Sequence, residues 1–227
     1  MSKANTHNRL TTLSAIALML QTGYFGATAQ EPDPYPDYLE EVFMDMDFEQ
    51  NLATPTVPAN LHTAVTTYMR NTASQFQKKL PDALKKVISV DMTRNGEAFI
   101  VTYPADELFN PNDTLLSKYA DRSLQELLPL MKDPYLYKVV YSVNSDDTGS
   151  ESYRYSLTDA RMNSLYDWLL KKIDDHKIPE EIIIIPETSG SLRPLADNLT
   201  RENRRKNRRV EFYFIPGPRL IENLQKK

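Results

Sequence analysis

The sequence contains no cysteine, which excludes disulfide bonds, thiol catalysis and a lipid-modified N-terminal cysteine. Histidine is scarce: only His7, His62 and His176 are present, far apart in the chain. A zinc site would therefore have to be assembled from carboxylates, and we expect neither a metal nor a cofactor. Ser150 lacks both a G-x-S-x-G context and a plausible histidine partner. These absences indicate that the protein is not an enzyme.

Residues 1–29 have the pattern of a secretory signal peptide. Lys3 and Arg9 give a basic start, residues 10–20 form a short apolar region, and 27–29 reads Ala-Thr-Ala, a small-residue cleavage site. The alternative is a retained membrane anchor, but a span needs about 20 apolar residues, and polar residues interrupt this region from Gln21 onward. We expect a cleaved signal peptide, export to the periplasm with possible association with the outer membrane, and no transmembrane span in the mature chain.

Residues 30–60 form an acidic, proline-rich arm. It carries eight acidic residues between Gln30 and Ala59 and no lysine or arginine. Such a composition predicts a flexible tether outside the folded core. Hydrophobic residues such as Phe43 and Phe48 are interleaved with the acids, so the alternative is that the arm docks on an envelope partner.

The remaining chain alternates helical and strand patterns. An Asn95-Gly96 pair predicts a hairpin turn, and the isoleucine run at 182–185 suits a parallel strand covered on both faces. We expect helices over 61–84, 116–131, 158–178 and 200–206, strands over 87–92, 99–109, 137–142, 182–185 and 210–215, and a loose tail over 217–227. This order predicts an α+β fold, a two-layer α/β sandwich.

Arg161 is unusual for the place we assign to it. If Thr158 caps the helix, Arg161 lies in the first turn, where a cation costs roughly 0.3–1 kcal/mol. A capping box would place Glu or Gln there. Asp146, in the loop before the helix, or the carboxylate of a ligand would reverse that penalty. The alternative is an arginine that extends into water.

Three blocks, in the same order, resemble the OmpA-like domain shared by OmpA, Pal and MotB. The first is Leu108-Phe109-Asn110-Pro111-Asn112-Asp113, and the second combines Asp146, Thr148 and Gly149 with Leu157-Thr158-Asp159-Ala160-Arg161. The third runs from Pro194 through Asn198, Thr200 and Glu202 to Asn207-Arg208-Arg209-Val210-Glu211. The resemblance covers residues 97–216, with β-α-β-α-β-(α)-β order, and leaves 61–96 as a helix and strand extension.

The resemblance implies non-covalent binding of peptidoglycan through the diaminopimelate of its stem peptide, and cell wall anchoring of an envelope partner. By position, Asp146 would take the ligand ammonium and Arg161 its carboxylate. Asn112, Asn207 and Arg208 would line the same cleft, and Leu157 and Thr158 would offer backbone groups.

Several residues depart from the family pattern. Val143 stands where Gly is usual and could narrow the pocket floor, Arg154 could compete with Arg161 for Asp146, and Ser191 replaces an acid. An altered ligand preference, or an OmpA-like adaptor with a lapsed pocket that works through protein contacts, therefore stays open. The basic residues between Arg201 and Arg209 resemble a nucleic-acid patch. However, no aromatic residues are interleaved with them, and we expect no nucleic acid partner.

Overall fold

The computed structural model describes residues 42–226, and its centre is one five-stranded sheet. The strand order is β1-β2-β5-β3-β4; all neighbours are antiparallel except β3 and β4, which are parallel. The strands are β1 (Ser89–Thr93), β2 (Ala98–Pro104), β3 (Tyr137–Asn144), β4 (Ile184–Gly190) and β5 (Arg209–Pro216). The predicted α+β sandwich is confirmed.

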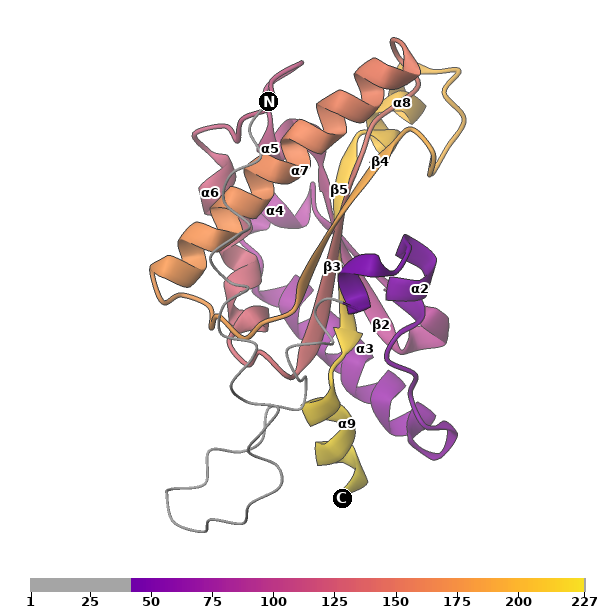
Figure 1. Cartoon of the computed structure of the whole chain (residues 1–227), viewed down its shortest axis with the longest axis vertical. Helices are drawn as coiled ribbons and strands as arrows, with labels where there is room; N and C mark the ends of the chain where they lie inside the picture. Colours follow the sequence, from indigo (N-terminus) through magenta and orange to yellow (C-terminus); the bar gives the residue numbers. More distant parts are fainter. Residues whose placement is uncertain (1–41, 227) are drawn as a thin grey trace. The chain divides into compact units, whose positions relative to one another are not determined.

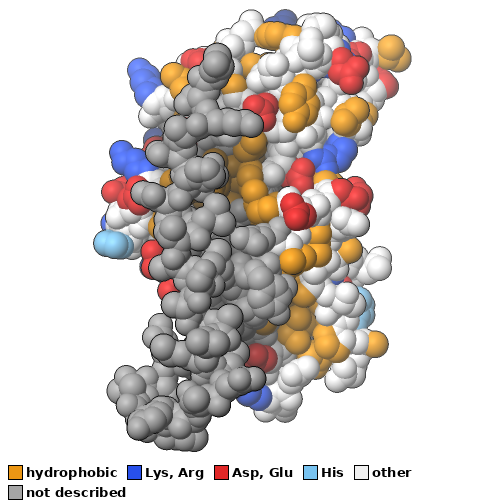
Figure 2. Space-filling view, in the orientation of Figure 1, with side chains coloured by type: hydrophobic (Ala, Val, Ile, Leu, Met, Phe, Trp, Pro, Cys, Tyr) orange, Lys and Arg blue, Asp and Glu red, His pale blue; other side chains and the backbone are white. Residues whose placement is uncertain are grey.

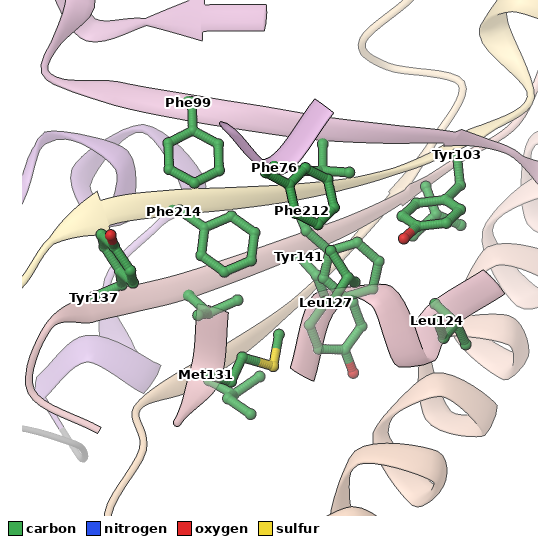
Figure 3. Close-up of a cluster of buried hydrophobic side chains, with 14 of the residues drawn as sticks. Phe76, Phe99, Tyr103, Leu124, Leu127, Met131, Tyr137, Tyr141, Phe212 and Phe214 are labelled. Atoms are coloured by element: carbon green, nitrogen blue, oxygen red, sulfur yellow. The ribbon is translucent and has the colours of Figure 1, made fainter. Parts of the chain in front are cut away.

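Aromatic side chains fill one face of the three central strands (Figure 3). Phe99 of β2 stacks on Phe214 of β5 with 4.9 Å between ring centroids, and Tyr141 of β3 stacks on Phe212 at 5.7 Å. Alternation along each strand places every second residue on this face. The rings therefore form one continuous ladder across β2, β5 and β3, the main hydrophobic core.

Helices cover this first face. The long ones are α3 (His62–Lys79) and α7 (Glu151–Asp174); Figure 1 shows α7 running along one side of the sheet. The shorter elements are η2 (Ala59–Leu61), α4 (Asp82–Lys85), η3 (Arg94–Gly96), α5 (Ala105–Leu108), α6 (Ala120–Leu124), η4 (Gln125–Met131) and α8 (Arg201–Asn207). The helix expected over 116–131 is thus a short α-helix followed by a 3-10 helix, because Pro129 cannot donate an α-helical hydrogen bond.

Several boundaries differ from the sequence prediction; the strand expected over 182–185, for example, is β4 over Ile184–Gly190. The strand expected to reach Phe109 ends at Pro104, and α5 follows. The helix expected to begin at Thr158 begins at Glu151, about two turns earlier. Ser150 is its N-cap, with its hydroxyl oxygen accepting a hydrogen bond from the Tyr153 amide at 3.2 Å.

The acidic arm is folded from residue 42 onward, which corrects the prediction of a flexible tether for residues 42–60; residues 30–41 of the predicted arm lie outside the described part of the chain. Helix α2 (Phe48–Ala53) packs on the second face of the sheet, opposite α7 (Figure 1). Phe43 is 3% exposed, and the Phe48 ring meets Tyr213 edge-on at 5.5 Å. The hydrophobic residues between the acids cover apolar side chains of β3, β4 and β5, and this burial outweighs the charge.

The C-terminal segment is also ordered, contrary to the expected loose tail. Helix α9 (Pro218–Gln225) buries Leu220 to 1% exposure, and Ile221 and Leu224 pack on the same core. The residue before the helix is Gly217. Only glycine fits there, because a Cβ would lie 2.1 Å from the Tyr135 carbonyl oxygen.

The extension predicted at 61–96 shares the hydrophobic core of the rest. Val65 and Met69 of α3 are fully buried in that core, and β1 pairs with β2. The predicted signal peptide lies outside the described residues. Within residues 42–226, no helix combines the length and the apolar character that a membrane span requires. On the face drawn in Figure 2, acidic and basic side chains are interspersed.

Candidate ligand-binding site

Asp146 lies just beyond the end of β3 and is 6% exposed. One carboxylate oxygen, Oδ2, accepts a hydrogen bond from Arg208 Nη1 at 2.6 Å. The other, Oδ1, accepts from the Thr148 backbone amide at 2.9 Å. Burial acts to raise the pKa of the Asp146 carboxyl, but the Thr148 amide and the Arg208 guanidinium outweigh it and lower the pKa below its ordinary value. Asp146 is therefore a fixed anion at neutral pH.

Arg161 lies about three turns into α7, so the first-turn penalty predicted for it does not apply. It is 5% exposed. Its Nε donates to the Asp113 carbonyl at 2.8 Å and its Nη2 to the Asn110 carbonyl at 3.3 Å. The guanidinium carbon lies 4.8 Å from the centroid of the Phe109 ring. Within the described residues, no carboxylate forms an ion pair with Arg161.

The loop between α5 and α6 holds Arg161 in place. Asn112 adopts a left-handed conformation, with φ 59°, and its Oδ1 is 3.5 Å from the Tyr153 hydroxyl. The Leu116 amide donates to Ser164 Oγ on α7 at 3.2 Å. Two backbone carbonyls of a turn pinned to α7 therefore orient the guanidinium.

The structure brings Asp146, Arg161, Arg208 and Asn112 to one end of the sheet, but it does not pair Asp146 with Arg161. Arg208 takes the place next to Asp146, and its Nη2 also lies 3.9 Å from Asp106. Burial lowers the pKa of the Arg161 guanidinium, and the nearby Arg208 charge lowers it further, against the opposing Asp106. The positive charge of Arg208 thus acts on both side chains predicted to bind the ligand: it pairs with the Asp146 carboxylate and repels the Arg161 guanidinium.

Three other residues predicted for the site, Leu157, Thr158 and Asn207, have structural roles. Thr158 is fully buried within α7; its hydroxyl donates to the Arg154 carbonyl at 2.9 Å and accepts from the Gly190 amide at 3.2 Å. Leu157 lies inside α7 as well, where helix hydrogen bonds occupy the backbone. Since the helix begins at Glu151, neither residue offers free amides at its start, which corrects that prediction.

Asn207 does not line a cleft, which is a further correction. It is fully buried, and its Oδ1 accepts from the Leu195 and Ala196 amides at 2.8 and 3.0 Å. Its Nδ2 donates to the Ala196 carbonyl at 2.9 Å. The side chain holds the loop before α8, because it replaces the backbone partners that this loop lacks.

The departures from the family pattern have plain structural consequences. Val143 is fully buried in the core rather than at a pocket floor. Arg154 does not compete for Asp146: its Nη1 donates to the Asp147 and Gly149 carbonyls at 3.1 and 2.6 Å. Arg154 thereby fastens the loop after β3 to the first turns of α7.

Sequence reasoning missed two features of the site. It overlooked Ser150 as the N-cap, although a serine followed by Glu151 in the first turn is a typical start signal. It also missed that the backbone carbonyls of Asn110 and Asp113 accept hydrogen bonds from Arg161, because no pattern of side chains predicts a backbone acceptor.

No family model matches the chain. Outer membrane protein A of Bordetella avium is 29% identical over 116 residues, 51% of this chain and 57% of that protein. The lipoprotein YiaD of Escherichia coli is 25% identical over 141 residues, 62% of this chain and 61% of that protein. The chain therefore matches less than two thirds of either curated relative.

Solved structures show the same fold. A MotB-like protein from Desulfovibrio vulgaris superposes with a TM-score of 0.59 at 22% identity, over 69% of this chain and 99% of that one. The cell wall anchor of the type VI secretion system from Pseudomonas aeruginosa gives a TM-score of 0.51 at 21% identity, over 63% and 96%. The fold is that of a MotB-like domain, and the sequence relatives together with it support the resemblance to the OmpA-like domain family.

Proposed function

We propose that the protein binds peptidoglycan without covalent chemistry, in the periplasm, and links an envelope partner to the cell wall. The group it recognises is the zwitterionic end of diaminopimelate in the stem peptide. The observation that carries this proposal is the state of Arg161, a nearly buried guanidinium that has no carboxylate partner among the described residues.

A buried cation without an anion is costly, because its hydration is lost and no charge replaces it. Carbonyl oxygens and the Phe109 ring offset part of this cost. A ligand carboxylate would complete the coordination through a charge-assisted hydrogen bond. Arg161 is thus prepared for an anion that the chain itself does not supply.

Asp146 provides the matching negative group for a ligand ammonium. Arg208 and Thr148 use one hydrogen bond at each carboxylate oxygen, and an ionised carboxylate has about four acceptor positions. An ammonium can therefore bind without breaking the existing contacts. Asn112 and Arg208 lie at the border of the site. Leu157, Thr158 and Asn207 stabilise the elements that carry the site and do not contact the ligand.

The other candidate is an adaptor that keeps the fold but has a lapsed pocket. The observation that favours it is the ion pair between Asp146 and Arg208. Asp146 is only 6% exposed, and Arg208 already balances its charge. The packing of residues 43–53 on the chain's own sheet counts against the arm as its contact surface, because Phe43 is buried there and Phe48 and Leu52 pack against the same cluster.

The test is retention of the purified protein on sacculi, followed by elution with free meso-diaminopimelate. Asp146→Asn and Arg161→Lys should each weaken retention about ten- to hundredfold, since a hydrogen bond to an ion is worth roughly 1.5–3 kcal/mol and a lysine lacks the guanidinium fork. Arg70→Gln, on the exposed side of α3, is the matched control and should bind like wild type.

1,5-Diaminopentane, which has ammonium groups but no carboxylate for Arg161, should not elute the bound protein when it is used at the same concentration. Equal retention of wild type and both site variants would refute this assignment and favour the adaptor. Circular dichroism of each variant separates lost binding from lost folding.

A further inference from the structure

A groove whose charged side chains are mainly basic lies at the same end of the sheet as the candidate site. Its walls come from α8, from the segment between α4 and β1, and from the ends of β2 and β5; the charged residues are Lys86, Glu202, Arg205, Lys206, Arg208 and Arg209. Arg208 belongs to both places, because its guanidinium contacts Asp146 while its side chain lines the groove. The groove thus shares Arg208 with the proposed diaminopimelate site.

Internal partners neutralise only some of these charges. Arg209 is buried against Glu211, with 2.8 Å between Nε and Oε1, and Arg208 is paired with Asp146. Lys206 contacts Glu202 at 3.2 Å in an exposed pair, and Arg205 lies 3.7 Å from Asp106.

Lys86 forms no ion pair with any residue in the described part of the chain and is exposed. Three cations that lack a buried partner, Lys86, Arg205 and Lys206, face two carboxylates, Glu202 of the lining and Asp106 beside Arg205, so that the positive charge of Lys86 is left over. Such an excess favours an anionic ligand group.

The position of the groove indicates which anion it meets. In a stem peptide of this type, diaminopimelate follows a γ-linked glutamate, whose α-carboxylate is either free or amidated. A ligand held at Arg161 and Asp146 would carry that carboxylate one residue away. Arg208 connects the two places, and the register that pairs Pro104 with Arg209 and Thr102 with Ser89 brings Lys86 to the same end of the sheet.

We propose that this groove binds the α-carboxylate of the glutamate next to diaminopimelate, so that the protein prefers stem peptides with a free acid over amidated ones. The inference rests on the proposed peptidoglycan binding and adds a specificity to it. Lys86, which lies outside the blocks that resemble the OmpA-like domain, is the main contributor because its charge is not used elsewhere.

The experiment compares two ligands by calorimetry: the dipeptide γ-D-glutamyl-meso-diaminopimelate and its glutamyl α-amide. Wild type should bind the acid about two- to fivefold more tightly, the range expected for solvent-exposed charge pairs. Lys86→Gln should bring the ratio close to one without changing the affinity for the amide, and Lys86→Arg should keep the preference. Glu202→Gln should increase the ratio, because it removes the one carboxylate of the groove lining.

Lys85→Gln is the matched control. Lys85 is the neighbouring residue of Lys86, but it pairs with Asp82 at 3.1 Å and does not line the groove. Added salt should reduce the preference for the acid, since exposed charges are screened. Equal binding of acid and amide by wild type would refute the proposed role of the groove and leave the proposed peptidoglycan binding intact. Failure of both ligands to bind would overturn both proposals, and a preference unchanged in Lys86→Gln would exclude Lys86 as its origin.

Discussion

Arg208, and not Arg161, forms the ion pair with Asp146: Nη1 of Arg208 lies 2.6 Å from Oδ2 of Asp146. This relationship leaves the Arg161 guanidinium with backbone carbonyls as its protein partners. A simple structural salt bridge between Asp146 and Arg161 would have closed the site from within. Instead, one arginine holds the anion, while the other makes hydrogen bonds only through Nε and Nη2 within the described residues.

The Asp146–Arg208 pair should show measurable coupling. In a double-mutant cycle with Asp146→Asn and Arg208→Gln, we expect about 1 kcal/mol by urea unfolding at pH 7, the upper end for pairs that water reaches. The more exposed pair of Asp106 and Arg205, 3.7 Å apart, is the control and should couple by much less. Because the folded pKa of Asp146 is lowered, its contribution is present above the unfolded pKa of about 3.9 and is lost as pH falls through the folded pKa. Coupling as large at pH 2, below the unfolded pKa, as at pH 7 would contradict this assignment.

Lys138 should make stability depend on pH. This side chain is fully buried; its Nζ donates to the Asn51 carbonyl at 2.6 Å and lies 4.2 Å from the Phe43 ring centroid. Burial, with repulsion from Arg94, lowers its pKa to about 7. The unfolded chain therefore binds one more proton between pH about 7 and the unfolded pKa of about 10.4, and stability should rise with pH there by up to about 1.4 kcal/mol per unit.

The comparison for Lys138 is between wild type and Lys138→Met, by urea unfolding at pH 7 and 9.5. The variant should lose this rise and should be the more stable at pH 7, because no charge needs to be removed on folding. Lys132→Met, at an exposed lysine, should keep the wild-type slope. A parallel pH dependence in wild type and Lys138→Met would show that Lys138 is not buried as described.

The segment on the second face should contribute to stability. Phe43→Ala should cost about 3–5 kcal/mol, the usual range for a buried phenylalanine, as measured by denaturant unfolding. Met44→Ala, at a neighbouring side chain that is 55% exposed, should cost little. If both changes were nearly neutral, the arm would be the tether that its composition predicts.

The C-terminal helix should likewise be part of the core. Leu220→Ala should cost about 2–5 kcal/mol, whereas Glu222→Ala, on the exposed side of the same helix, should change stability by less than about 0.5 kcal/mol. Thermal melts of the two variants give the comparison. Equal melting temperatures would mean that α9 does not hold its place on the core.

Local patterns in the sequence predicted much of the fold. Hydrophobic periodicity and turn-forming residues act over a few positions. They predicted the Asn95-Gly96 turn, the alternation in β2 and β5, and the order of strands and helices. The resemblance blocks likewise located Asp146, Arg161 and Arg208 before any geometry was known. Errors arose at the ends: α7 extends to Ser150, and a tail predicted to be loose forms α9.

Sequence determined which charged groups gather at one end of the sheet, because strand order and motif order place them there. Only the tertiary structure decided their pairing. Arg208 reaches Asp146, 62 positions away in sequence, because β5 lies beside β3. Arg161 meets backbone carbonyls of the turn at 110–113, and side-chain patterns do not predict such acceptors. The same holds for the acidic arm: its composition predicts a tether, but an apolar sheet face, assembled from residues of β2, β3, β4 and β5, gives its phenylalanines a surface to pack on.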